Sequence, residues 1–446
     1  MPADFEIGDM ENNNEYKASF YNIVVDENDN NKYIWNSKRG SIVELENELF
    51  DLLMKGDFDN DKMAPLMDDL CAEGFVVPKG NNEYEEILFH SRMRQFSLVQ
   101  DSCGLVITPT MNCNYRCPYC FESTATSKRE VMSPEVIDDV VKAVGKYFDE
   151  FDKCKQCRIT WFGGEPLLGY DKVIVPLQSK LVALASKRGF DIRFNIITNG
   201  FFLTEDKFEF MFKKNFTKYV QVTFDGTAEE YAKRKGVTTD AYYRVFDNIM
   251  NLSKYIKDND LDARVNIRLN VDNDNYPSLL EFVDNVRNDT RYSDCFTFAL
   301  ERLRAYDSCK TLNNYCSTEE FEMLEREFNA YVGKAPKVPE PKLTFCGQNC
   351  MNVFCVGVKG ELYKCEHDFG IREHSVGNIR TGLNYSQYMN DFLNQPMPEK
   401  CKECKLVPIC LGGCPHRRLA NKQKVECDFT IENVKKSIRN YIKSGR

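Results

Sequence analysis

The sequence predicts an α/β fold with a parallel sheet at its centre, a small αβ unit before the sheet and a cysteine-dense segment after it. Six apolar stretches rich in β-branched residues alternate with stretches of helical periodicity between residues 104 and 303. That alternation implies parallel strands, in either an open doubly wound sheet or part of a barrel. Residues 336–342 hold three prolines and mark a boundary. At about 150 residues per domain, the 446 residues suggest roughly three domains.

Composition excludes several classes of function. Hydrophobic residues make up 42% and charged residues 28% of the chain, which is ordinary for a protein with a buried core. The net charge of −9 disfavours nucleic-acid and membrane-surface partners. No apolar run approaches the roughly 18 residues that a membrane span needs, and the acidic start lacks the pattern of a secretory signal. We therefore expect a cytoplasmic protein without nucleic-acid or membrane partners.

The first part of the chain predicts a domain that recognises a peptide. A polar, Asn-rich flexible terminus is expected over 1–16, a winged-helix-like αβ domain over 17–85, and a linker over 86–103. Residues 1–80 carry 7 basic and 18 acidic side chains, and such an acidic surface repels phosphate, so a peptide or protein partner is favoured over DNA. The expected elements are strands at 19–26 and 32–37, a helix within 40–56 capped by Ser41, and a second helix that ends at Gly74 before a short strand.

The sheet is expected over residues 104–310. Ser133 and Pro134 predict the N-cap and the first position of the helix that follows the first strand. In either parallel architecture the chemistry belongs at the C-terminal ends of the strands. A bridging segment is expected over 311–342, and the cysteine-rich domain over 343–446 ends in a basic helix. The predicted strands are 104–109, 158–164, 192–198, 219–225, 264–271 and 295–303.

The 19 cysteines stand beside only 4 histidines. A reducing compartment disfavours disulfides, so the clustering indicates all-thiolate sites for iron–sulfur clusters or zinc. Cys113, Cys117 and Cys120 follow the first strand of the sheet, where three thiolates can hold three irons of a 4Fe–4S cluster and leave the fourth iron open to a small molecule. The alternatives are a zinc knuckle that lacks its fourth ligand and three packed thiols without a metal.

This C-x3-C-x2-C pattern, with Tyr119 before the last cysteine, resembles the signature of the radical S-adenosylmethionine (SAM) superfamily. The resemblance implies a partial (β/α)6 TIM-like barrel. Gly163-Gly164-Glu165-Pro166 matches the motif that holds the SAM ammonium; a carboxylate suits a cation and glycines permit close approach. By the same resemblance, further cofactor-binding residues are Tyr119, Thr198, Asn199, Thr223 in place of a serine, and Arg244.

The C-terminal cysteines resemble the SPASM extension of radical SAM enzymes that modify peptides and proteins. Nine residues separate Cys350 from Gly360, and four residues separate Gly360 from Cys365. The resemblance implies two auxiliary 4Fe–4S clusters, three clusters in all, and Cys355 is an extra thiol that could replace Cys350 as a ligand. The first auxiliary cluster would use Cys346, Cys350, Cys365 and Cys414, and the second Cys401, Cys404, Cys410 and Cys427.

Two further features stay open at this level. Glu366 follows Cys365, where sulfatase-maturing relatives have an aspartate proposed as a base; it is a candidate catalytic base or an ordinary hydrogen-bond acceptor. Cys154 and Cys157 could form a metal pair, although isolated thiols are the simpler interpretation.

The resemblance implies a peptide maturase that makes a 5′-deoxyadenosyl radical, takes hydrogen from a ribosomally made precursor peptide docked by its leader, and forms a Cys-derived thioether crosslink, as sactisynthases, ranthipeptide enzymes and SCIFF maturases do. A low-potential flavodoxin or ferredoxin would supply electrons. The alternatives are an anaerobic formylglycine-generating sulfatase maturase, a maturase forming carbon–carbon bonds or epimers, and a zinc-stapled binding protein without enzymatic activity.

Overall fold

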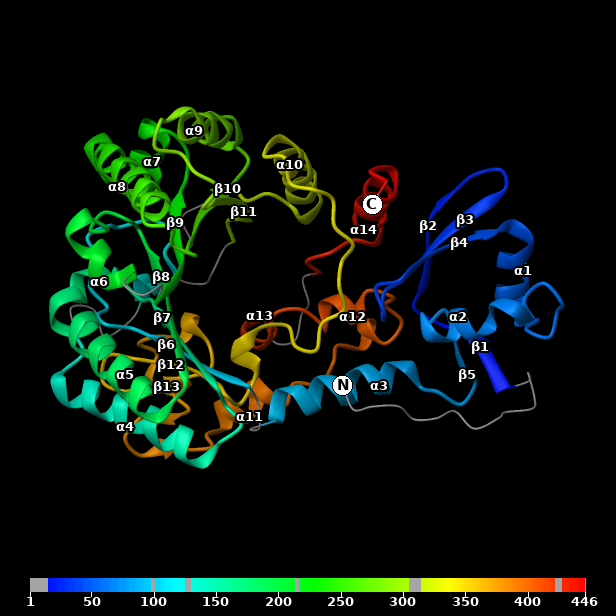
Figure 1. Ribbon diagram of the computed structural model, residues 1–446, viewed down its shortest axis with the longest axis horizontal. Helices are drawn as coiled ribbons and strands as arrows, with labels where there is room; N and C mark the ends of the chain where they lie inside the picture. Colours follow the sequence, from blue (N-terminus) through cyan, green and yellow to red (C-terminus); the bar gives the residue numbers. More distant parts are fainter. Residues whose placement is uncertain are drawn as a thin grey trace. The chain divides into compact units, whose positions relative to one another are not determined.

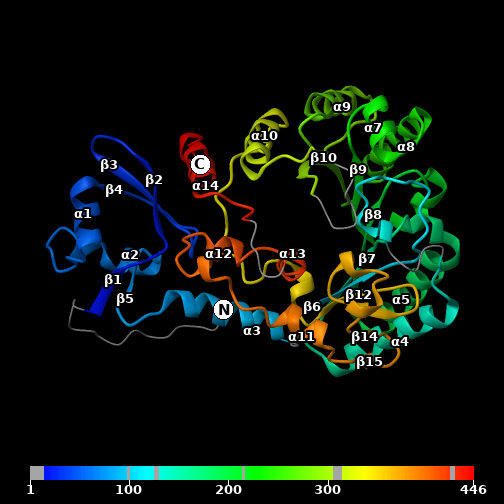
Figure 2. The ribbon, with the colours of Figure 1, turned by 180° about the vertical axis from the view of Figure 1, so that it is seen from behind.

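The computed structural model describes residues 15–97, 101–124, 130–212, 216–304, 314–421 and 427–445. The chain divides into two compact units, and each is described by itself (Figures 1 and 2). The larger unit comprises residues 96–333 and 346–395, and the smaller unit comprises the described residues of 1–95, 334–345 and 396–446. Chain segments far apart in sequence therefore share each unit. The domain boundaries expected from the sequence follow chain order instead, and they stay a prediction.

The larger unit is built on one sheet of ten strands in the order β11-β10-β9-β8-β7-β6-β12-β13-β14-β15. Neighbours from β11 to β12 are parallel and the remaining pairs are antiparallel. The six strands predicted for the barrel are confirmed. The strands are β6 (Ser102–Ile107), β7 (Gln156–Trp161), β8 (Asp191–Thr198), β9 (Thr217–Phe224), β10 (Arg264–Val271), β11 (Phe296–Arg302), β12 (Val353–Val356), β13 (Glu361–Tyr363), β14 (Gly377–Asn378) and β15 (Gly382–Leu383).

Helices line the outer face of this curved sheet (Figure 1). Alternate residues of the strands, such as Ile159 and Trp161 of β7, are buried beneath them, as the two-residue period of a strand requires. The predicted start of α4 is confirmed, because the Ser133 hydroxyl accepts a hydrogen bond from Val136 N and Pro134 opens the helix. The helices are α4 (Pro134–Glu150), α5 (Val175–Arg188), α6 (Phe208–Phe212), α7 (Ala228–Lys235), α8 (Thr239–Asp258), α9 (Tyr276–Asn288), α10 (Thr318–Tyr331) and α11 (Gln387–Leu393).

The cysteine-rich segment continues the sheet of the barrel. β12 pairs in parallel with β6, with Cys355 opposite Val106, and β13 returns antiparallel to β12. Cys355, Val106 and Met111 lie in one buried apolar cluster. The edge of the sheet that carries the first cysteine motif is therefore covered by residues that come about 250 positions later in the chain.

The smaller unit contains a three-stranded antiparallel sheet, β2-β3-β4, and a two-stranded sheet, β1-β5. One prediction is wrong here: residues 42–46 form β4 against β3, so the helix begins at Asn47 and Ser41 is not its N-cap. Helix α3 runs through much of the segment expected to be a linker. The elements are β1 (Tyr16–Ala18), β2 (Asn22–Glu27), β3 (Asn31–Asn36), β4 (Ile42–Glu46), β5 (Val76–Pro78), α1 (Asn47–Lys55), α2 (Met67–Ala72), α3 (Glu83–Phe96), α12 (Val407–Cys410), α13 (Pro415–Ala420) and α14 (Ile431–Lys443).

The core of the smaller unit joins the two ends of the chain. Ile23 and Trp35 of the N-terminal sheet pack with Ile409 of α12 and with Val434 and Ile438 of α14. The predicted C-terminal helix is confirmed, and Thr430 caps it. Among the described residues, we find no helix with the length and hydropathy needed to cross a bilayer.

Candidate active site

The C-terminal ends of four neighbouring strands carry the residues that the sequence singled out. The loop with Cys113, Cys117 and Cys120 follows β6, and Gly163–Pro166 follows β7. Thr198 is the last residue of β8, and Thr223 lies next to the end of β9. Because parallel strands end at the same edge of a sheet, these residues share one edge, as predicted.

The three thiols of the β6 loop lie close enough to influence one another electrostatically. Burial raises the pKa of the Cys113 thiol to about 11 and that of Cys120 to about 12, and the neighbouring thiols act in the same direction. Cys113 Sγ also accepts a hydrogen bond from Tyr115 N at 3.4 Å. Three desolvated thiolates in one loop need a bound cation to be stable, and iron supplies it in a cluster. The loop therefore fits the cluster that its spacing predicts.

Glu165 is fully buried and links the ends of β7 and β8. Its Oε1 accepts hydrogen bonds from Thr198 Oγ1 at 2.7 Å and from Leu167 N at 3.0 Å, and its Oε2 accepts one from Asn199 N at 2.8 Å. Burial raises the pKa of the carboxyl to about 7, although each of these donors lowers it. The carboxylate is thus held rigidly, and a cationic group bound beside it would offset the cost of burying its charge.

The two glycines before Glu165 are required by close backbone approach. Gly163 and Gly164 have positive φ values of 84° and 49°. A Cβ on Gly164 would lie 2.3 Å from Asn112 O, and one on Gly163 would lie 2.5 Å from Thr108 Cγ2. Side chains here would close the space over the β6 and β7 strand ends.

Glu122 belongs to this site but was missed from the sequence. Its Oε2 accepts a hydrogen bond from Gly164 N at 2.9 Å, and burial raises its pKa to about 7. Glu122 Oε1 and Thr108 Oγ1 are buried without a hydrogen-bond partner among the described residues. These two oxygens border the glycine pair and fit a ligand that brings its own donors, as the SAM ammonium would. The only signal in the sequence was the position of Glu122, two residues after Cys120.

Tyr119 reaches a buried polar network at the ends of β9 and β10. Its hydroxyl donates to Asp225 Oδ2, which lies 3.4 Å from Lys235 Nζ. Asn270 Nδ2 donates to Asp225 Oδ1 at 3.1 Å. Asp225 is fully buried, so the network holds the aromatic ring before Cys120 in one orientation. Asp225 lies two residues after the predicted Thr223, but the sequence did not indicate this role.

Thr223 and Arg244 are the least constrained of the predicted cofactor residues. Thr223 is half-buried between the buried Val222 and Phe224, so it faces away from the helical layer. Arg244 is exposed, donates from Nε to Phe201 O at 3.1 Å, and places its guanidinium 4.3 Å from the centre of the Phe201 ring. Their contacts with SAM stay predictions.

A second group of thiols in the larger unit surrounds a buried lysine. Cys346, Cys350 and Cys355 all interact electrostatically with Lys364, whose Nζ donates to Cys350 O at 2.7 Å and to Val353 O at 2.6 Å. Cys355 also interacts with Cys346 and Cys365. Burial lowers the pKa of Lys364 to about 8, and the nearby thiols oppose that shift. A buried cation among several thiols is the surrounding that a negatively charged cluster requires.

Glu366 and His367 lie beside Cys365. Glu366 Oε2 accepts a hydrogen bond from Gln348 Nε2 at 3.2 Å and lies 4.0 Å from Cys365 Sγ. His367 Nδ1 lies 3.6 Å from the same sulfur. Glu366 is therefore placed next to a candidate ligand, and its assignment as a base stays a prediction.

The smaller unit holds a third group of thiols. Cys401 interacts electrostatically with Cys404 and Cys427, and Cys410 interacts with Cys401 and Cys427. These are the four residues predicted for the second auxiliary cluster. Cys414 lies next to Arg417 and Arg418.

Arg418 provides the test of whether this group fits a cluster. Its side chain is buried beside Cys401, Cys410 and Cys414. Its Nε and Nη1 have no hydrogen-bond partner within the part of the chain that the structure describes. An unpartnered buried guanidinium is costly, and a cluster with anionic sulfurs would supply its acceptors.

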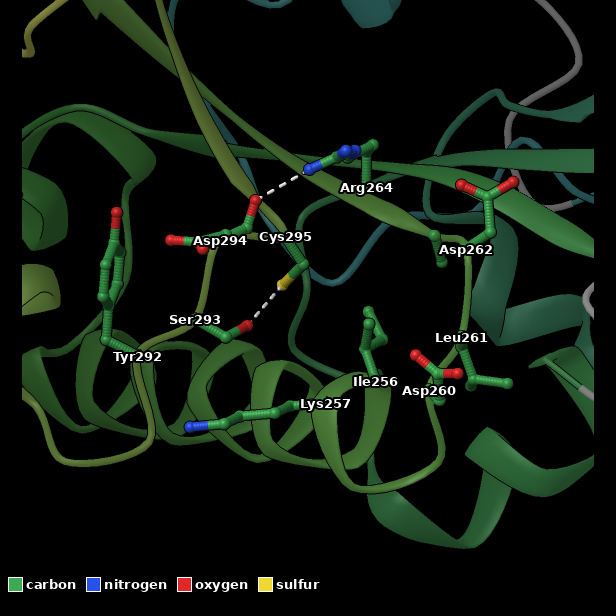
Figure 3. A pocket seen from close by; sticks show the side chains of 11 residues that line it. Ile256, Lys257, Asp260, Leu261, Asp262, Arg264, Tyr292, Ser293, Asp294 and Cys295 are labelled. Atoms are coloured by element: carbon green, nitrogen blue, oxygen red, sulfur yellow. Dashed lines mark hydrogen bonds between the residues drawn. The ribbon is translucent and has the colours of Figure 1, made fainter.

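Two further observations limit where else in the described residues a site could lie. Across the described ranges, no three His, Cys, Asp or Glu side chains gather closely enough to hold a single metal ion. A pocket of about 420 Å³ lies at the start of β10 and just before β11, at the opposite ends of the strands from the thiols (Figure 3). In it Arg264 Nη1 donates to Asp294 O at 2.8 Å and Ser293 Oγ donates to Cys295 Sγ at 3.2 Å. None of the predicted site residues lines it.

Comparison with known proteins agrees with this geometry. Residues 107–285 match the family model of the Radical SAM superfamily. The radical SAM cyclopropyl synthase TigE of Paramaledivibacter caminithermalis is 24% identical over 235 residues, 46% of this chain and 48% of TigE. This chain thus matches about half the length of TigE.

Two other similarities span more of the chain. A cysteine-type anaerobic sulfatase-maturating enzyme of Clostridium novyi is 24% identical over 364 residues, which are 72% of this chain and 90% of that enzyme. The crystal structure of Streptococcus suis SuiB bound to precursor peptide SuiA has a TM-score of 0.50 at 16% identity and covers 90% of this chain and 95% of SuiB. The structural likeness shows a shared fold.

Proposed function

We propose that this chain is a radical SAM enzyme that modifies a ribosomally made precursor peptide and forms a Cys-derived thioether crosslink. The observation that carries the proposal is the common edge at which the thiols of Cys113, Cys117 and Cys120 meet the buried Glu165 carboxylate. When bound, SAM and its cluster supply a 5′-deoxyadenosyl radical, and auxiliary clusters supply an acceptor for the surplus electron.

In this proposal the residues of the chain bind SAM and orient it. Glu165, fixed by Thr198 and Asn199, receives the ammonium group of SAM. Gly163 and Gly164 leave room for the methionine part, and Glu122 offers a further acceptor at the same place. Thr223 and Arg244 contact the SAM carboxylate, and the Asp225 network holds the ring of Tyr119.

Two buried cationic side chains are evidence for the two auxiliary 4Fe–4S clusters of this proposal. Lys364 lies beside the thiols of the first site and Arg418 beside those of the second. Cys346, Cys350 and Cys365 would ligate the first, with Cys355 as the rival of Cys350. Cys401, Cys404, Cys410 and Cys427 would ligate the second.

A peptide substrate is supported by the proteins to which the chain is similar. SuiB is bound to a precursor peptide in its crystal structure, and sulfatase-maturating enzymes, as their name states, act on sulfatases. The acidic N-terminal region adds a surface for a peptide leader. We choose thioether formation among peptide modifications because a complete SPASM cysteine pattern after such an N-terminal domain is typical of thioether maturases. A flavodoxin or ferredoxin in the cytoplasm would be the electron donor.

Sulfatase maturation is the second candidate. It is favoured by the sequence similarity that spans 90% of the Clostridium novyi enzyme. It is disfavoured by Glu366, which stands where those relatives have an aspartate, and by the additional N-terminal domain.

The deciding experiment is an anaerobic incubation of the enzyme with SAM, a low-potential reductant and a Cys-containing peptide encoded beside its gene. Mass spectrometry is run before and after alkylation of thiols. Thioether synthesis removes two hydrogens for each modified cysteine and protects that cysteine from alkylation under reducing conditions. Conversion of the thiol to an aldehyde would instead establish formylglycine chemistry. Cleavage of SAM with unchanged peptide mass would contradict crosslinking of that peptide.

A further inference from the structure

An aromatic stack connects the first cysteine loop to the second group of thiols in the larger unit. Phe121 directly follows Cys120 and opens a short 3₁₀ helix, Phe121–Thr124. Its ring stacks on the imidazole of His367, with ring centres 4.0 Å apart and planes inclined by 27°. The two rings come from segments about 245 positions apart in the chain, so the contact exists only in the folded unit.

The same imidazole reaches a sulfur of the second group. His367 Nδ1 lies 3.6 Å from Cys365 Sγ. A thiolate can only accept a hydrogen bond, so with Cys365 deprotonated as a ligand the Nδ1–H donates to it. Covalent bonds, one ring stack and one N–H···S hydrogen bond therefore lead from Cys120 to Cys365 without a gap larger than van der Waals contact.

Two further aromatic rings pack around the stack and hold it in place. Phe162 stacks on Phe121 at 6.3 Å between ring centres and on Phe369 at 6.2 Å. Phe369 lies in the buried cluster with Cys355 and Met111, and Phe162 packs against that cluster. An apolar surrounding keeps the dielectric constant low, and hydrogen bonds to the cluster sulfurs then have a large effect on the reduction potential.

We propose that His367 is a positioning residue for the Cys365 ligand and that His367 and Phe121 together carry an electron between the two iron–sulfur sites of the larger unit. The inference rests on the proposed function in one respect, because Cys365 has to be a ligand of an auxiliary cluster. The step is the transfer of one electron: an auxiliary cluster that gained it from the oxidised peptide returns to its 2+ state, and the SAM-binding cluster goes from 2+ to 1+. No bond is formed or broken.

Three variants separate the two parts of this connection. His367→Phe retains an aromatic ring against Phe121 but removes the N–H donor to Cys365. Phe121→Leu removes the ring stack and leaves the imidazole beside Cys365. The matched control is His374→Phe, since His374 also stacks on an aromatic ring, Tyr388 at 4.1 Å, but its Nδ1 lies 2.8 Å from Asp368 Oδ1 and not beside a sulfur.

The holoenzyme is reduced completely, freed of reductant and mixed with excess SAM in the absence of peptide. The first equivalent of 5′-deoxyadenosine uses the electron already on the SAM-binding cluster, and later equivalents need electrons from the auxiliary sites. We expect His367→Phe and Phe121→Leu to slow the later equivalents by about 10- to 100-fold, as changes next to metal ligands commonly do. The decay of the auxiliary EPR signal should slow equally, while the first equivalent and His374→Phe behave as the wild type.

A redox titration followed by EPR tests the positioning role separately. Loss of the N–H donor in His367→Phe should make the auxiliary reduction potential more negative, whereas Phe121→Leu should leave it unchanged. Later equivalents that form at the wild-type rate in both variants, or that never form in the wild type, would overturn the inference. About four irons per chain with no auxiliary EPR signal in the wild type would instead refute the auxiliary clusters of the proposed function.

Discussion

The Thr198 hydroxyl donates a hydrogen bond of 2.7 Å to the Glu165 carboxylate, and this contact joins the ends of two neighbouring strands. Glu165 follows β7 and Thr198 closes β8, so the sheet itself places the acceptor for a cation next to the Cys113 loop. The hydrogen bond is buried at both ends. The position of this hydrogen bond explains why the Gly163–Pro166 motif after β7 depends on Thr198 at the end of β8.

Replacement of Glu165 should abolish tight binding of SAM. Glu165→Gln keeps the volume but removes the charge, and a hydrogen bond to a charged group contributes about 1.5–3 kcal/mol, or roughly 10- to 100-fold in affinity. Equilibrium dialysis with SAM measures the change. Glu135→Gln, at the exposed start of α4, is the control, and equal affinity of both variants would remove Glu165 from the site.

The buried Glu165 carboxyl should also make stability depend on pH. Its pKa rises from 4.5 to about 7 on folding, so the folded state binds more protons between these values and stability falls as pH rises through this window. At about 1.36 kcal/mol per pKa unit, the loss approaches about 3 kcal/mol above pH 7. Thermal unfolding of the cluster-free protein at pH 5 and pH 8 should show a smaller difference for Glu165→Gln than for the wild type. An identical difference would contradict the burial of this group.

Gly164→Ala should impair the site through backbone approach. Both Gly164 and Gly189 have positive φ, but a Cβ at Gly164 meets Asn112 O at 2.3 Å, whereas one at Gly189 meets nothing within 4 Å. Strain of the backbone alone costs about 1–3 kcal/mol, so Gly189→Ala measures that part. We expect the melting temperature to fall further, and SAM affinity to be lost, only in Gly164→Ala. Matching affinities in the two variants would show that the glycine is not needed for close approach.

Arg418→Met should lower the iron content of the protein. The variant removes the only cation that the structure, over its described ranges, shows interacting with Cys401, Cys410 and Cys414 together. Iron should fall from about 12 to about 8 per chain if one 4Fe–4S cluster is lost. Lys402→Met, which breaks an exposed ion pair with Glu399 in the same segment, should keep the full complement. Full iron in Arg418→Met would mean that the guanidinium does not compensate a cluster.

The elements that could be predicted from the sequence are those that depend on local patterns. The strands of the sheet and the Ser133 cap could be predicted because alternation and capping are properties of a few adjacent residues. The helix expected over 40–56 was wrong at its start because residues 42–46 gain more from pairing with β3 than their helical spacing offers.

The sequence by itself determined the kind of chemistry, since the Cys113 loop and the Gly163–Pro166 motif carry it in their residue types and spacing. Only the tertiary structure decided the partners of those motifs. Glu122 against Gly164, Asp225 against Tyr119, and Phe121 against His367 are contacts between distant segments. The pairing of β12 with β6 brings the last of them together. No local pattern encodes such contacts, because they arise when the chain closes into a sheet and buries the groups that must then find one another.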